Sequence, residues 1–120
     1  MVGTVAGSAQ KKPPREPEVE IVRIHTTRQA GRIVYDGTYR IRGIRPVNGL
    51  VLHLSFFESR GGMVSQQKIE LETSALSPGE ERSFEVQGRD VPRAVRFTVA
   101  ATDRGGRDLN LTGPGPYPLD

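Results

Sequence analysis

Apolar side chains recur at every second position along most of this chain, and this alternation limits the folds that it can adopt. The pattern is clearest in GLVLHLSFFE (residues 49–58), where Leu50, Leu52, Leu54 and Phe56 alternate with positions on the opposite face. A period of two is that of a β-strand with one buried face, whereas an amphipathic helix has a period of 3.6. No segment of ten or more residues shows apolar positions at helical spacing. The sequence therefore predicts an all-β protein.

Seven short segments share this pattern, with Gly, Pro or Asn at their junctions. They span residues 18–26, 31–44, 49–58, 63–73, 82–87, 92–103 and 108–112. The second contains Asp36-Gly37 and is either one bent strand or two pieces. Short strands at such regular spacing are typical of a two-sheet antiparallel sandwich. We predict a single antiparallel β-sandwich of about seven strands. The expected core includes Ile33, Tyr35, Tyr39, Ile41, Phe84, Val86, Val95, Phe97, Val99 and Ala101.

The two ends of the chain differ in composition from the middle. Residues 1–17 combine Gly, Ser, Lys and Pro without periodicity, which is typical of a disordered tail or linker. The small residues of AGSA within them also fit the end of a signal peptide. Alternate prolines in residues 113–120 predict an extended C-terminal tail that does not pair in a sheet. The sandwich domain is thus expected at residues 18–112.

Composition limits the chemistry that the chain can perform. A domain of 120 residues needs no metal or disulfide to fold, and the absence of cysteine excludes thiolate ligands and thiol catalysis. No apolar stretch approaches the ~20 residues that span a bilayer. The net charge is +3, and residues 23–57 hold six arginines and one acid. Nucleic-acid sites usually have a denser positive charge, so ordinary solvated strand faces are the simpler interpretation.

The triplet Arg-Gly-Gly occurs twice, in FFESRGGMVSQQ (residues 56–67) and in DRGGRDLN (residues 103–110). A phosphate-binding loop needs a helix after its glycines, and an RGG box needs many repeats interleaved with aromatics. Neither context is present. Consecutive glycines instead supply the positive φ angles of type I′ hairpin turns. We predict two turns, with Arg60 and Arg104 available for contacts at their tips.

Candidate catalytic and metal-binding side chains are few and lack a recognisable spacing. They are His25, His53, Glu70, Glu72, Glu80, Glu81, Asp103, Asp108 and Asn110. The histidines fall in no motif, and Glu70 and Glu72 are expected to share one solvated strand face rather than to flank a cleft. The loop residues at 103–110 match no EF-hand and are explained by turn chemistry. We therefore expect no enzyme activity, cofactor or metal.

Several segments of the middle of the chain resemble the FxLYD domain. They are YRIRGIRPVNG (residues 39–49), LSFFE (54–58), SRGGMV after it and LSPGEERSFEV (76–86). The similarity covers about residues 39–101, and Phe57 and Glu58 stand where that family has Tyr and Asp. FxLYD domains are immunoglobulin-like sandwiches of bacterial and archaeal secreted or surface proteins. The resemblance implies that fold and an exported location, and it implies no catalytic activity.

These observations predict a non-enzymatic interaction module, located outside the cytoplasm, whose partner is another protein. The expected contact residues are Arg60 and Arg104 at the loop tips and Arg40, Arg42 and Arg45 along the second strand. The alternative is a module that binds a polyanion, either nucleic acid or an acidic polysaccharide, through the arginine-rich strand face. The charge density argues against nucleic acid as the partner.

Overall fold

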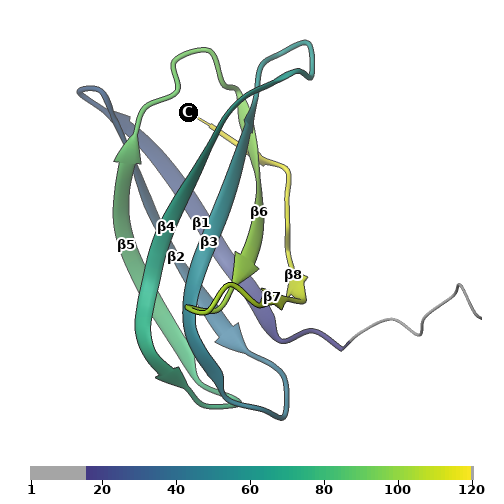
Figure 1. The fold of residues 1–120 in the computed structure, drawn as a ribbon. Helices are drawn as coiled ribbons and strands as arrows, with labels where there is room; N and C mark the ends of the chain where they lie inside the picture. The colour runs from purple at the N-terminus through teal and green to yellow at the C-terminus, as the bar shows by residue number, and fades with distance from the viewer. Residues whose placement is uncertain (1–15, 120) are drawn as a thin grey trace, which may run out of the picture.

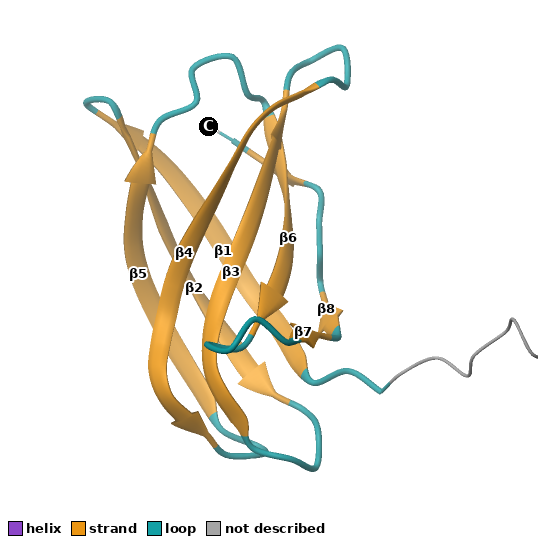
Figure 2. Ribbon diagram, in the orientation of Figure 1, coloured by secondary structure: helices purple, strands orange, loops and turns teal. Residues whose placement is uncertain are grey.

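The computed structural model describes residues 16–119, which form two packed β-sheets and no helix (Figures 1 and 2). The strands are β1 (Val19–Gln29), β2 (Arg32–Ile41), β3 (Val47–Phe57), β4 (Met63–Leu76), β5 (Glu81–Arg89), β6 (Arg96–Thr102), β7 (Asp108–Leu109), β8 (Leu111–Thr112) and β9 (Tyr117–Pro118). One sheet has the order β5-β2-β1-β8, and the other has the order β4-β3-β6-β7, with β9 also paired to β6. The predicted β-sandwich is confirmed. Most of the predicted N-terminal tail lies outside the described residues.

Among the described strands the chain crosses between the sheets five times, at the β2–β3, β4–β5, β5–β6, β7–β8 and β8–β9 connections. The hairpins β1–β2 and β3–β4 therefore lie in different sheets. Figure 2 shows that the β1–β2 turn, the β3–β4 loop and the β5–β6 loop gather at one end of the sandwich, at the top of the view. The β2–β3 loop and the β4–β5 turn lie at the opposite end. None of the described elements is a helix that could cross a membrane.

The core consists of the inward positions that the alternation marks. Leu50, Leu52, Leu54 and Phe56 of β3 are each at most 1% exposed. The prediction was wrong for Val95, which is 41% exposed. Val95 precedes the first residue of β6, so the strand alternation does not yet fix the direction of its side chain.

Strand β2 runs without a break through Asp36-Gly37, so residues 32–41 form one strand rather than two pieces. The reason lies in β1, whose register with β2 shifts between Ile21 and Arg23. This bulge brings the backbone of β1 onto Gly37, where a Cβ atom would lie 2.1 Å from the carbonyl oxygen of Arg23. A glycine inside a strand commonly marks such a close backbone approach.

Both Arg-Gly-Gly triplets form turns, as predicted, but not type I′ turns. In the first, the amide of Gly61 donates to the carbonyl of Glu58 and the amide of Glu58 donates to the carbonyl of Gly62, both at 2.9 Å. Only Gly61 of this pair has a positive φ, and only Gly106 has one in the second turn. This is the pattern of a three-residue hairpin loop that ends in one left-handed glycine. Each triplet therefore needs one glycine for its conformation, not two.

The β1–β2 turn has positive φ angles at both of its central residues, Ala30 (47°) and Gly31 (82°), as in a type I′ turn. Alanine is strained in this region, whereas asparagine adopts it readily and Asn-Gly is a preferred type I′ pair. We expect Ala30→Asn to raise the free energy of unfolding by about 1 kcal/mol in urea denaturation. Ala75→Asn, at an exposed position of β4 without this strain, is the control and should give no gain. An equal response of the two variants would contradict the strain.

The C-terminal segment is extended, as predicted, but it does pair with the domain. Tyr117 pairs with Phe97 of β6, and their ring centroids lie 5.5 Å apart. Leu119 is 9% exposed, and its amide donates to the carbonyl of Val95. Strand β8, just before this segment, pairs in parallel with β1 and so belongs to the sheet opposite β6. The segment thus lies along the side of the sandwich between β1 and β6 (Figure 1). Pro118 has no amide hydrogen to donate, and the contacts with β6 are made by its neighbours Tyr117 and Leu119.

Candidate interaction surface

Two of the arginines predicted to make contacts are neutralised within the domain. The guanidinium of Arg40 lies 2.6 Å from a carboxylate oxygen of Glu81 and 3.4 Å from one of Glu20. Arg42 binds the same Glu20 oxygen at 2.8 Å. These pairs join β1, β2 and β5 across the outer face of one sheet. The second strand therefore presents a mixed ion-pair network rather than a basic stripe.

Arg104 is also engaged, although it stands in an exposed turn. Its side chain lies over Gly49, where a Cβ atom would meet its Cγ at 2.2 Å, and its guanidinium donates to the carbonyl of Thr73 at 2.9 Å. Arg104 therefore fastens the β6–β7 turn to β3 and β4. Arg45 and Arg60 are exposed and form no ion pair with the described residues. They lie at opposite ends of the sandwich, in the β2–β3 and β3–β4 loops.

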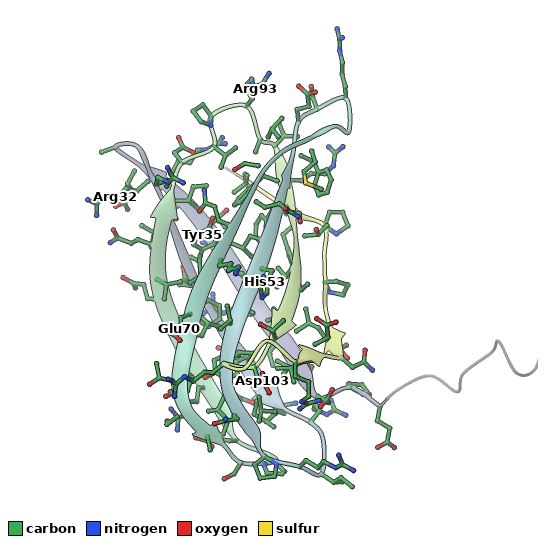
Figure 3. All side chains as sticks on the ribbon, viewed as in Figure 1. Arg32, Tyr35, His53, Glu70, Arg93 and Asp103 are labelled. Carbon is green, nitrogen blue, oxygen red and sulfur yellow. The ribbon has the colours of Figure 1, made fainter. Side chains whose placement is uncertain are left out.

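Arg60 belongs to a group that sequence analysis missed. The group, called the arginine end here, consists of Arg32, Arg60, Arg89, Arg93 and Arg96. All five lie at the end formed by the β1–β2 turn, the β3–β4 loop and the β5–β6 loop, and Figure 3 shows Arg32 and Arg93 there. Among residues 16–119, none of the five has a carboxylate within ion-pair distance. Local sequence could not reveal this group, because most of the acids that neutralise the other arginines come from a different strand or loop, Asp103 beside Arg107 being the exception.

Two of these arginines face each other. Arg32 of β2 and Arg89 of β5 are cross-strand partners, and like charges in directly opposed positions are destabilising. Arg32 is bonded only to the neutral Gln87, at 2.9 Å. The nearby Asp90 is already bound by Arg28, at 2.9 Å. The pair therefore carries uncompensated positive charge that an anion from outside would relieve.

Partly exposed apolar residues lie near the other three arginines. Phe57 at the end of β3 pairs with Met63 of β4 on one side and with Arg96 of β6 on the other. The amide of Val95 donates to the carbonyl of Phe57 at 2.8 Å. Met63 is 54% exposed and Val95 is 41% exposed. This part of the surface thus combines partly exposed apolar side chains with arginines.

Arg28 holds the β5–β6 loop in place beneath this surface. Its guanidinium donates to the carboxylate of Asp90 and to the carbonyls of Val91 and Ala94, at 2.7 to 2.9 Å. The loop that carries Arg93 is thereby fixed to β1. The hydrogen bonds of Arg28, which are partly buried, therefore hold the backbone on both sides of Arg93.

Tyr35 lies below the same loop, and its buried hydroxyl has no hydrogen-bond partner among residues 16–119. Burial raises the pKa of this hydroxyl, and the nearby Asp90 adds to the effect. Because an unsatisfied buried hydroxyl is destabilising, we expect Tyr35→Phe to raise the free energy of unfolding by about 1 kcal/mol. Tyr117→Phe is the control, since its hydroxyl donates to the carbonyl of Gly113 and its removal should lower stability. A loss of stability in Tyr35→Phe would show that the hydroxyl is bonded in solution.

The side chains considered for catalysis are held in structural contacts. His53 lies 2.8 Å from the Thr102 hydroxyl, and the exposed His25 lies 3.6 Å from Asp36. Glu70 and Glu72 do not share one face, contrary to the prediction. A register shift in β4 puts Glu72 opposite the buried Leu50 and Glu70 opposite Val51.

Glu72 and Glu80 both bind Arg82 of β5. Hydrogen bonds from Ser74, together with Arg82, hold the pKa of Glu72 below its usual value, and the amide of Ser77, with Arg82, lowers the pKa of Glu80. A catalytic general acid needs the opposite shift. The cluster instead joins β4 and β5, the edges of the two sheets.

A depressed carboxyl pKa contributes stability that is present above the usual value of 4.5 and is lost as the pH falls through the folded-state pKa. We expect Glu72→Gln to have lower stability than the wild type at neutral pH and a flatter decline in acid. Urea midpoints measured between roughly pH 7 and pH 3 check this. Glu70→Gln, at an exposed carboxylate, should follow the wild-type curve. Identical acid declines for Glu72→Gln and the wild type would contradict the assignment.

The loop oxygens considered for a metal serve the second turn. One carboxylate oxygen of Asp103 accepts the amide of Arg107 at 2.9 Å, which closes the turn around Gly106. Within the described part of the chain, no three His, Asp or Glu side chains are grouped so that they could hold a metal ion.

No model of a protein family matches the chain, and no curated protein matches it.

Proposed function

We propose that this chain is a non-enzymatic interaction module whose contact surface is the arginine end. The observation that carries the proposal is that five of the arginines without an ion pair among the described residues lie at one end of the domain. Arg32, Arg60, Arg89, Arg93 and Arg96 share one end, whereas Arg40 and Arg42 are neutralised by Glu20 and Glu81. Five arginines that form no ion pair with the described residues, gathered at one end of a small domain, favour an anionic partner. The strand face that the polyanion alternative required lacks this free charge.

The test compares two single charge reversals that change the net charge equally. Arg93→Glu alters the arginine end, and Arg45→Glu alters an exposed, unpaired arginine at the opposite end. Binding of three fluorescent anions is followed by anisotropy: a polyglutamate peptide, a heparin oligosaccharide and a single-stranded oligonucleotide. We expect at least one to bind, with Arg93→Glu weakening it about tenfold and Arg45→Glu less than about twofold. Equal effects of the two variants, or binding of none of the three, would refute the proposal.

The resemblance to FxLYD domains supports placing this module outside the cytoplasm as part of the same proposal. Phe56 is buried at the end of β3, and Ser77-Pro78-Gly79-Glu80 forms a turn in which the Glu80 amide donates to the Ser77 carbonyl and Gly79 has a positive φ. These are the positions that carry the resemblance. Sequencing the N-terminus of the protein from its native host tests the location. Cleavage near Ala9 supports export, and an intact N-terminus in the cytoplasmic fraction contradicts it.

A further inference from the structure

The arginine end combines positive charge with exposed apolar side chains, and the two features together narrow the chemistry of its partner. Charge alone suits a phosphate polymer, a sulfated polysaccharide or an acidic protein equally well. Met63 and Val95, whose backbones lie next to that of Phe57, are not part of the core cluster and are partly open to solvent. A phosphate or sulfate chain offers them no apolar contact. A peptide offers both a carboxylate and an apolar side chain within a few residues.

A carboxylate on this surface, that of Glu58, also favours a peptide over a phosphate polymer. Glu58 begins the β3–β4 turn, and its carboxylate lies close to Gly62, with Oε2 3.0 Å from where a Cβ would be. It has no ion-pair partner among residues 16–119. A continuous row of phosphates would have to pass this carboxylate, and repulsion between like charges would oppose it. A peptide can place its own acids on either side of Glu58.

The arginines near these apolar residues can bind carboxylates. Arg96 is half-buried next to Phe57, and one of its terminal nitrogens lies 3.7 Å from the position of a Cβ on Gly61, so it reaches the β3–β4 loop. Arg60 follows in that loop, and Arg93 projects from the neighbouring β5–β6 loop (Figure 3). A guanidinium binds a carboxylate through two parallel hydrogen bonds, which adds orientation to the charge.

From these contacts we propose that the partner is an acidic protein segment. It places an apolar side chain on Met63 and Val95, and it places carboxylates on Arg60, Arg93 and Arg96. This inference rests on the proposed function, since it names the partner of the same surface. Aromatic side chains, Met and Arg are enriched at the centres of protein interfaces, which is the set of residues found here.

Its experiment uses the full chain and three labelled probes of equal length. The first is a Glu-rich peptide of about twelve residues with a central leucine, long enough when extended to cross ~40 Å. The second has serine in place of the leucine, and the third is an oligonucleotide of about twelve nucleotides. We expect the leucine peptide to bind about tenfold more tightly than the serine peptide and than the oligonucleotide. Val95→Ser should remove most of the difference between the two peptides.

The outcomes separate this inference from the function on which it rests. If the oligonucleotide binds most tightly and Arg93→Glu weakens it, the arginine end is the binding surface and the acidic-segment inference is wrong. Equal affinities for the leucine and serine peptides also overturn the inference. If Arg93→Glu and Arg45→Glu affect every probe equally, both proposals fail. Because Val95 is 41% exposed, Val95→Ser should not disturb the fold, and an unchanged urea midpoint checks this.

Discussion

Replacing Phe97 by alanine is expected to lower the free energy of unfolding by about 4 kcal/mol. Phe97 is fully buried, and its ring packs against Tyr35 at 6.0 Å, Phe56 at 6.1 Å and Tyr117 at 5.5 Å between ring centroids. It thus joins β2, β3, β6 and the C-terminal segment. Its removal leaves a cavity lined by aromatic rings that are fixed by separate strands and cannot all move inward. Urea denaturation followed by circular dichroism measures the loss.

Phe57→Ala is the matched control for this prediction. Phe57 is also in a strand that pairs with β6, but its side chain lies on the outer, partly exposed face. Its truncation should cost about 1 kcal/mol, since less apolar area leaves water when it folds. Similar losses for the two variants would show that the aromatic cluster around Phe97 is not the centre of the core.

Gly37→Ala is expected to destabilise the domain by at least about 3 kcal/mol, the upper part of the range for overpacking. Its Cβ would lie 2.1 Å from the carbonyl oxygen of Arg23 and 2.9 Å from the ring of Phe84. The first neighbour is backbone, so relief requires the β1 bulge to move away from β2. The same urea titration measures the effect.

Gly43→Ala supplies the comparison for Gly37. Its Cβ would meet no atom closer than 3.7 Å, and its φ is not in the left-handed region. Its stability should change by less than about 0.5 kcal/mol. If Gly37→Ala changed the free energy of unfolding as little as Gly43→Ala, the β1 backbone could not lie as close to Gly37 as the structure places it.

The sandwich and most of its core could be predicted because alternation is a local property. Leu50 to Phe56 alternate, and a strand with one buried face follows directly. Bulges are not local in this sense. The register shift near Glu72 depends on how β4 meets β3, and the continuity of β2 through Gly37 depends on a bulge in β1. Neither could be derived from the segment that it affects.

The candidate surface was predicted in part for the same reason. Arg40 looks as free in the sequence as Arg60, but its partner Glu81 lies 41 positions away and meets it only when β2 pairs with β5. The charge pattern along the sequence therefore predicts a basic strand, whereas five of the described arginines that form no ion pair lie at one end of the fold. Arg60 was expected as a contact residue. The other four, Arg32, Arg89, Arg93 and Arg96, are distinguished only by their lack of ion pairs with the described residues of the folded domain.

The most direct measurement of the central claim is a map of the binding surface by nuclear magnetic resonance. The ¹⁵N-labelled chain is titrated with the leucine-containing acidic peptide, and shifts of the backbone amides are recorded. We predict that the changes concentrate in residues 30–32, 58–63 and 89–96, at the arginine end. Changes centred on Arg45 and the β2–β3 loop, changes spread evenly over both sheets, or no changes at millimolar peptide would contradict the account.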